Sequence, residues 1–106
     1  MGGKGKEKML ERAWNKTQNA LSSIQRAYHD ALDTYADEYG KQYTKIKNML
    51  GLSEKQKEKK IYSAWKRYSD RISTATKLYN KKTKAELDKF RKRKKQIENI
   101  TKKKRV

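Results

Sequence analysis

The stretch ERAWNKTQNALSSIQRAY (residues 11–28) is echoed fifty-one residues later by YSAWKRYSDRISTATKLY (residues 62–79). Both stretches contain Ala-Trp, an aliphatic residue seven positions after the Trp, and a Tyr fourteen positions after it. When the chain is aligned with itself at this shift, without gaps, twelve positions are identical. Because internal repeats mark duplicated structural units, we interpret the chain as two copies of one helical segment. Two separate helices that converged on one heptad pattern are the alternative.

The repeated segments carry the spacing of an amphipathic helix. From Leu10 to Leu50, and again from Ile61 to Ile97, apolar residues recur at steps of four and three, which indicates one stripe along each helix. The chain contains no Pro, so long uninterrupted helices are allowed. The residues expected to form the seam between the helices are Trp14, Leu21, Ile24, Tyr28, Tyr39, Trp65, Ile72, Tyr79, Phe90 and Ile97.

The break between the two stripes predicts a short turn. Gly51 suits a left-handed helix C-cap, and Ser53 suits an N-cap whose capping box is completed by Gln56. We therefore expect an all-α fold, a helical hairpin of two long antiparallel helices forming one domain over residues 1–106. Its parts are helix one at about 6–50, the turn at 51–53, helix two at about 54–101 and a basic tail at 102–106.

A turn at this place also predicts which residues face each other. Residue i of the first helix should lie opposite roughly residue 103 − i of the second, which brings Trp14 to Phe90 and Tyr39 to Trp65. Only 33% of the residues are hydrophobic, so two helices bury a marginal core on their own. We therefore expect the hairpin to associate with copies of itself, as an oligomer or a filament.

Charge is the strongest functional signal in the sequence. The chain has 30 Lys and Arg against 12 Asp and Glu, a net charge of +18. Residues 1–52 hold nine basic and six acidic groups, a net of +3, whereas residues 53–106 hold twenty-one and six, a net of +15. Such a charge attracts polyanions, and nucleic acid is the first candidate. The second helix should therefore carry the binding surface.

Lys and Arg side chains bind phosphates without reading the base sequence. The chain lacks the patterns of the common major-groove readers and of sheet-based RNA-binding domains. We predict sequence-independent binding, with duplex DNA favoured over RNA. The expected phosphate-binding residues are Lys55, Lys59, Lys66, Arg67, Arg71, Lys77, Lys81, Lys84, Arg91, Lys92, Arg93, Lys94, Lys95, Lys102, Lys103, Lys104 and Arg105.

An acidic strip in the first helix balances part of this charge. Asp30, Asp33 and Asp37, with Glu38 beside them, should face Arg71 and its basic neighbours on the second helix. We interpret the strip as salt bridges that set register, either within the hairpin or between subunits. A metal site is the alternative, but the strip lacks the Asp/Asn-Gly loop of a calcium site, and we expect no metal.

Other classes of function find little support in the residues. There is no Cys, the single His29 lies inside an expected helix, and no phosphate loop or nucleophile motif is present. We therefore expect no enzyme activity, no cofactor and no small-molecule substrate. No secretory signal and no apolar run of about 20 residues is visible, so we expect neither secretion nor membrane insertion. A membrane-surface role would need apolar side chains that the seam already uses.

Three features of the sequence resemble those of a known group of proteins. They are the Gly51–Ser53 junction between two long helices and the basic stretches FRKRKK (residues 90–95) and TKKKRV (residues 101–106). In plan the chain resembles the small, basic, all-α coat or nucleocapsid proteins of filamentous archaeal viruses, whose long helices wrap DNA. The resemblance implies many copies enclosing DNA in a virion. It assigns no individual residue.

Two other interpretations stay open. A cellular nucleoid or chromatin-type protein that compacts DNA would follow the same physics. A structural coiled-coil protein would use its basic surface to bind an acidic protein partner. We therefore expect the protein in a virion or in an intracellular nucleoprotein, with the nucleoid or nucleus of a host not excluded.

Overall fold

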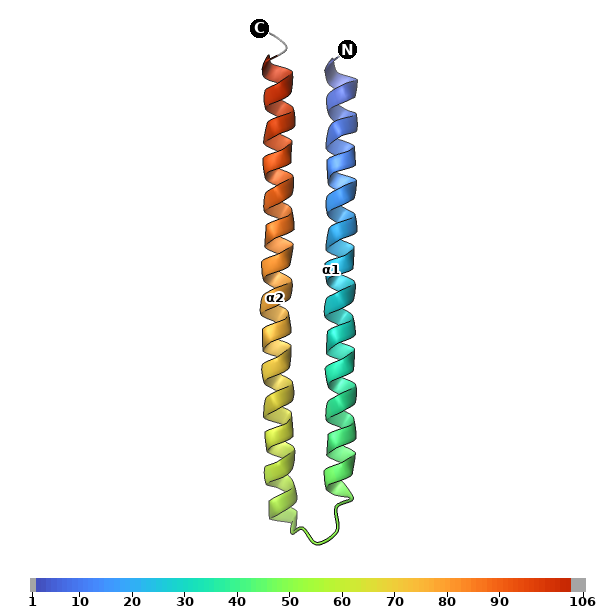
Figure 1. Cartoon of the computed structure of the whole chain (residues 1–106), viewed down its shortest axis with the longest axis vertical. Helices are drawn as coiled ribbons and strands as arrows, with labels where there is room; N and C mark the ends of the chain where they lie inside the picture. The colour runs from blue at the N-terminus through green and yellow to red at the C-terminus, as the bar shows by residue number, and fades with distance from the viewer. Residues whose placement is uncertain (1, 104–106) are drawn as a thin grey trace. The chain divides into compact units, whose positions relative to one another are not determined.

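The computed structural model describes the backbone of residues 2–103 and the side chains of residues 5–100. It contains two α-helices, α1 (Gly2–Lys47, 46 residues) and α2 (Glu54–Lys103, 50 residues). The two helices pack antiparallel as a hairpin, as Figure 1 shows, which confirms the predicted all-α fold. Helix α2 begins at the predicted residue, whereas α1 ends at Lys47, three residues earlier than predicted.

The early end of α1 has a local cause. The amide of Asn48 still donates to the carbonyl of Thr44 (3.1 Å), but the amide of Met49 donates to Ile46 (3.1 Å), only three residues back. This tighter turn ends the α-helix. Leu50 then leaves the stripe, and its side chain is 98% exposed. The expected extension of the apolar stripe to Leu50 is therefore wrong.

The turn itself follows the predicted chemistry. Gly51 has a φ of +84°, the left-handed conformation that favours glycine. The amide of Ser53 donates to Oε1 of Gln56 (2.9 Å), and the amide of Gln56 donates to Oγ of Ser53 (3.1 Å). These two bonds are the reciprocal capping box. Nζ of Lys57 also donates to the carbonyl of Lys47 (3.0 Å), which ties the end of α1 to the first turn of α2.

Contacts divide the chain into two compact units, each made of one stretch of α1 and one stretch of α2. We call residues 1–26 with 79–106 the terminal unit, and residues 27–78 the turn unit. Each is described by itself below. The expectation of a single domain stays a prediction.

In the terminal unit, an aromatic pair joins the two helices as predicted. The rings of Trp14 and Phe90 lie 5.0 Å apart between centroids, tilted by 59°. Ile97 is buried, with 1% of its surface exposed. The buried hydroxyl of Thr17 donates to the carbonyl of Ala13 (3.0 Å). The hydroxyl of Thr83, in contrast, is buried and finds no hydrogen-bond partner among the described residues.

In the turn unit, the second predicted aromatic pair is wrong. Tyr39 stacks on Tyr68, with 5.2 Å between ring centroids, and not on Trp65. Trp65 instead lies beside Tyr62 on its own helix and is 49% exposed. The buried position belongs to Ala64, one residue earlier. Because one residue rotates a helix by about 100°, Trp65 turns from the seam to its flank.

The core of each unit is thin. Ile46, Ala64 and Ile97 are the buried hydrophobic residues of the part that the structure describes. Of the other expected seam residues, Trp14 and Trp65 are partly exposed. The rest are half-buried, namely Leu21, Ile24, Tyr28, Tyr39, Ile72, Tyr79 and Phe90. In the turn unit, the hydroxyls of Tyr28 and Thr76 add a hydrogen bond of 2.7 Å between the helices.

Candidate nucleic-acid interface

The positive charge is divided unequally between the two units. The terminal unit holds nineteen basic and five acidic residues, a net of +14. The turn unit holds eleven and seven, a net of +4, because the whole acidic strip of α1 belongs to it. A polyanion is therefore attracted more strongly to the terminal unit.

A groove in the terminal unit gathers basic side chains from both helices. Its volume is about 480 Å³, and Met9, Ala13, Thr17 and Phe90 contribute to its lining. Helix α1 supplies Arg12 and Lys16 to this groove, and α2 supplies Lys89 and Arg93 together with the acidic Glu86. We call these four cations the groove cations.

The groove cations form two pairs with the same spacing. Arg12 and Lys16 are four residues apart on α1, and Lys89 and Arg93 are four apart on α2. Residues at this spacing lie on one face of a helix, about 6 Å apart along its axis. Successive phosphates of a DNA strand advance about 3.4 Å along the duplex. The spacing within each pair is therefore comparable with the distance between near-neighbour phosphates on one strand.

Only part of the positive charge in the groove is neutralised inside the chain. Nζ of Lys89 lies 3.4 Å from Oε1 of Glu86, and Nη1 of Arg93 donates to Oε1 of Gln96 (3.4 Å). Neither Arg12 nor Lys16 has an ion-pair partner among the described side chains. The groove thus presents a net charge of +3 over an apolar lining, which suits a phosphate and the sugar beside it.

The predicted phosphate-binding residues of the terminal unit are exposed wherever the structure describes their side chains. Only Arg93 among them lines the groove, and Arg91 lies 3.5 Å from Asp88, an exposed pair. Lys102, Lys103, Lys104 and Arg105 lie outside the described side chains. The exposed members are Lys81, Lys84, Arg91, Lys92, Arg93, Lys94 and Lys95.

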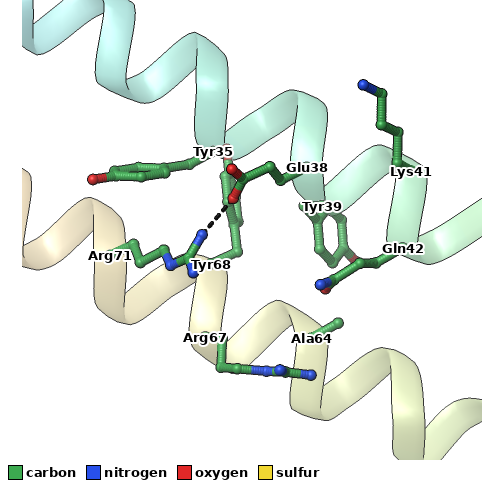
Figure 2. Close-up of a pocket in the computed structure, with 9 residues that line it drawn as sticks. All are labelled: Tyr35, Glu38, Tyr39, Lys41, Gln42, Ala64, Arg67, Tyr68 and Arg71. Carbon is green, nitrogen blue, oxygen red and sulfur yellow. Dashed lines mark hydrogen bonds and ion pairs between the residues drawn. The ribbon is translucent and has the colours of Figure 1, made fainter.

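A second groove, of about 240 Å³, lies in the turn unit and is shown in Figure 2. Its Arg71 is already engaged, because the guanidinium forms an ion pair with Glu38 and lies over the ring of Tyr35, 5.5 Å from the centroid. Arg67 lines the same groove without an ion-pair partner in the described part of the chain. Of the two predicted arginines, only Arg71 has its charge balanced by a carboxylate of the described part of the chain.

One salt bridge of the acidic strip joins the two helices as expected, because Glu38 pairs with Arg71. Asp37 instead pairs with Lys41 on its own helix (3.0 Å). Side chains of an α-helix lean toward its N-terminus, so in an antiparallel hairpin Arg71 leans toward the turn and Glu38 leans away from it. The two meet although their backbone positions are offset. Both pairs are at least half exposed and contribute only about 0–1 kcal/mol each.

The remaining predicted ligands of the turn unit are exposed lysines. Lys59 lines a shallow hollow with Lys60 and Arg67, while Lys55, Lys66 and Lys77 point to solvent.

Sequence reasoning missed Arg12, Lys16 and Lys89 as candidate ligands. The signal was present, because two pairs of cations with i,i+4 spacing flank the Trp14–Phe90 contact, which the facing rule brings together. The low net charge of the first half of the sequence concealed it.

No protein-family model, no curated protein and no solved structure matches this chain. Neither described helix is long and apolar enough to cross a membrane. In the part of the chain that the structure describes, no three His, Cys, Asp or Glu residues cluster as metal ligands.

Proposed function

We propose that this protein is a non-enzymatic, sequence-independent nucleic-acid-binding protein that packages duplex DNA in many copies, as a coat or nucleocapsid protein does. The observation that carries the proposal is the groove of the terminal unit, where Arg12, Lys16, Lys89 and Arg93 converge from two helices. Four cations around one groove favour a strand of phosphates over an isolated anion.

Charge distribution supports the choice of ligand. The terminal unit carries a net charge of +14, and its cations are exposed around the Arg91–Lys95 run. An acidic protein would offer carboxylates at irregular spacing, whereas duplex DNA offers a charge for every ~1.7 Å of its axis. A regular row of cations on a helix is the better match to a regular row of phosphates.

The side chains in the groove also argue against base reading. Lys and Arg can also bind guanine in the major groove, but Met9 and Phe90 add no hydrogen-bonding group for the other bases, so phosphate contacts are favoured over base contacts. Affinity should therefore depend on salt and hardly at all on sequence.

Binding of the purified full chain to labelled duplex DNA, single-stranded DNA and duplex RNA over a salt series tests this function. Polyglutamate of equal charge serves as the competitor that controls for general polyanion binding. We expect steep salt dependence, no sequence preference, and regular nucleoprotein particles by electron microscopy only when nucleic acid is present. Binding that polyglutamate abolishes at equal charge, or particles that form without nucleic acid, would instead support a structural coiled-coil protein.

A further inference from the structure

The turn unit exposes three large aromatic side chains. Tyr62 and Trp65 of α2 are 62% and 49% exposed, and Tyr43 of α1 is 40% exposed. The rings of Tyr62 and Trp65 lie against each other, with 6.3 Å between centroids and 27° between planes. Aromatic rings contribute most to binding when their surface is removed from water. Rings that pack together and still face solvent therefore indicate a surface that another molecule covers.

The rings of the two helices lie on the same flank of the turn unit, away from the groove of Figure 2. Arg67 and Glu38 line that groove. Trp65 precedes Arg67 by two residues, a rotation of about 160° on α2. Tyr43 follows Glu38 by five residues, a rotation of about 140° on α1. In an antiparallel pair of helices these two rotations lead to the same side.

Four charged side chains border these rings, and three of them are basic. Nζ of Lys47 lies over the ring of Tyr43, 5.6 Å from the centroid. The other three stand three or four residues from Tyr62, a spacing that makes them its neighbours on the helix. They are Glu58, Lys59 and Lys66. None of the four has an ion-pair partner among the described side chains, so the rings are bordered by a net charge of +2.

Single-stranded nucleic acid matches this combination of rings and cations. Every nucleobase has a flat π-face, and proteins that bind single strands place aromatic rings for stacking beside cations that follow the backbone. The surface next to Tyr43 is open, because a Cβ built at Gly40 meets nothing within 4 Å. The bases of a closed duplex are stacked on their neighbours, so only an unpaired base offers its face to the rings.

Two other occupants fit this flank less well. A second copy of the chain would bring the lysines around both sets of rings together, and like charges across an interface are unfavourable. A lipid surface would need further apolar side chains beside the rings. Gly40 and Ser69, which stand next to Tyr43 and Trp65 along their helices, supply none.

We propose that the exposed rings of the turn unit form a stacking site for the unpaired bases of single-stranded nucleic acid. The site consists of Tyr43, Lys47, Tyr62 and Trp65. The inference rests on the nucleic-acid binding of the proposed function and adds a second mode to it. The groove of the terminal unit binds phosphates of any strand, whereas the stacking site requires bases that are free of a duplex.

Two strands of equal length and charge separate stacking from phosphate binding. One is oligo-dT, and the other is the same strand with abasic sugars in place of the thymidines. The test compares the full-length wild type with the double variant Tyr62→Leu and Trp65→Leu by fluorescence anisotropy. Leu keeps a high helix propensity and an apolar side chain but has no π-face.

We expect the double variant to bind oligo-dT at least about tenfold more weakly than the wild type, because stacking is lost. Its affinity for the abasic strand and the salt slope should stay unchanged, since no charge is removed. Leu78→Ala is the matched control, because Leu78 is also 50% exposed on α2 but lies outside the site. An equal loss for both strands, an equal loss in the control, or no loss would overturn the proposal.

Tryptophan fluorescence tests the contact without removing the rings. The chain has two Trp residues, so Trp14→Phe leaves Trp65 as the single reporter. We expect oligo-dT to quench this emission and the abasic strand to leave it unchanged at a concentration where both are bound. Equal quenching by the two strands would overturn the stacking site. Emission that changes with protein concentration and not with oligo-dT would assign the rings to a second copy and overturn it as well.

Binding of a closed duplex, measured on the same variants, separates this proposal from the proposed function. A chain that binds duplex DNA but holds oligo-dT no more tightly than the abasic strand refutes the stacking site alone. A chain that binds oligo-dT through Tyr62 and Trp65 but does not bind duplex DNA refutes duplex packaging and leaves the stacking site in place.

Discussion

Replacement of the four groove cations by Gln should reduce the slope of log DNA affinity against log salt. The reduction should be larger than in any other variant that loses four positive charges. The variant changes Arg12, Lys16, Lys89 and Arg93 together, and Gln retains a helix propensity close to that of Lys and Arg. All four side chains reach one groove from two helices. The hairpin should therefore stay folded while the groove loses its charge.

The expected magnitude follows from counting phosphate contacts. Each contact on duplex DNA contributes about 0.9 to the slope of log affinity against log salt. Four contacts give about 3.6, and we expect about 3 because Lys89 is held partly by Glu86 at 3.4 Å. Between roughly 0.05 and 0.2 M salt, a slope smaller by 3 removes about a 60-fold change in affinity.

Fluorescence anisotropy of a labelled duplex measures the slope directly. The matched control replaces four cations of the turn unit that lie outside both the groove and the predicted phosphate ligands. These are Lys41, Lys45, Lys47 and Lys60. Both variants lose the same charge, so only the position of that charge differs. Equal slopes for the two variants would refute the assignment of phosphate binding to the groove and indicate binding by the net charge of the chain alone.

The acidic residue of the groove allows a prediction of opposite sign. Glu86→Gln removes the partner of Lys89 and frees its ammonium for a phosphate. We expect tighter binding at low salt and a slope steeper by about 0.6, the part of one contact that the pair with Glu86 withholds. Asp88→Gln, which frees Arg91 outside the groove, is the comparison. An unchanged slope for Glu86→Gln would show that Lys89 contacts no phosphate.

Three substitutions test the fold by urea denaturation. Thr83→Val should stabilise the chain by about 1 kcal/mol, because it removes a buried hydroxyl without a partner among the described residues, and a loss of stability would contradict this. Ser53→Ala should cost about 1 kcal/mol by opening the capping box, and an unchanged midpoint would refute that role. Trp14→Ala should cost about 2–3 kcal/mol, and more than Trp65→Ala in dilute monomer, because Trp14 packs on Phe90 of the other helix. The reverse order would contradict the terminal aromatic contact.

Local signals in the sequence predicted the fold well. The spacing of apolar residues, the absence of Pro and the residues Gly51, Ser53 and Gln56 specify two helices and their junction, because caps and turns depend on neighbouring residues. The facing of Trp14 and Phe90 followed from the position of the turn alone.

Rotation about the helix axis was harder to predict than position along it. The repeat places Trp65 where Trp14 stands, yet Ala64 takes the buried position and Trp65 lies on the flank. A heptad pattern drifts by about 20° per repeat against a 3.6-residue helix, so the seam moves gradually across neighbouring residues. Composition concealed Arg12 and Lys16, because the first half of the sequence has a low net charge, whereas their place beside α2 depends on azimuth about the axis of α1.

The junction between Lys47 and Glu54 also decides which chain completes each hairpin. Seam contacts such as Trp14 with Phe90 are indifferent to whether both rings belong to one molecule. If the junction were helical, α1 and α2 would merge into one continuous rod, and two rods could exchange halves and keep every contact. Such exchange is a low-cost route to dimers when a hinge changes. Gly51 and the capping box at Ser53 thus determine that the α1 and α2 of each hairpin belong to the same chain.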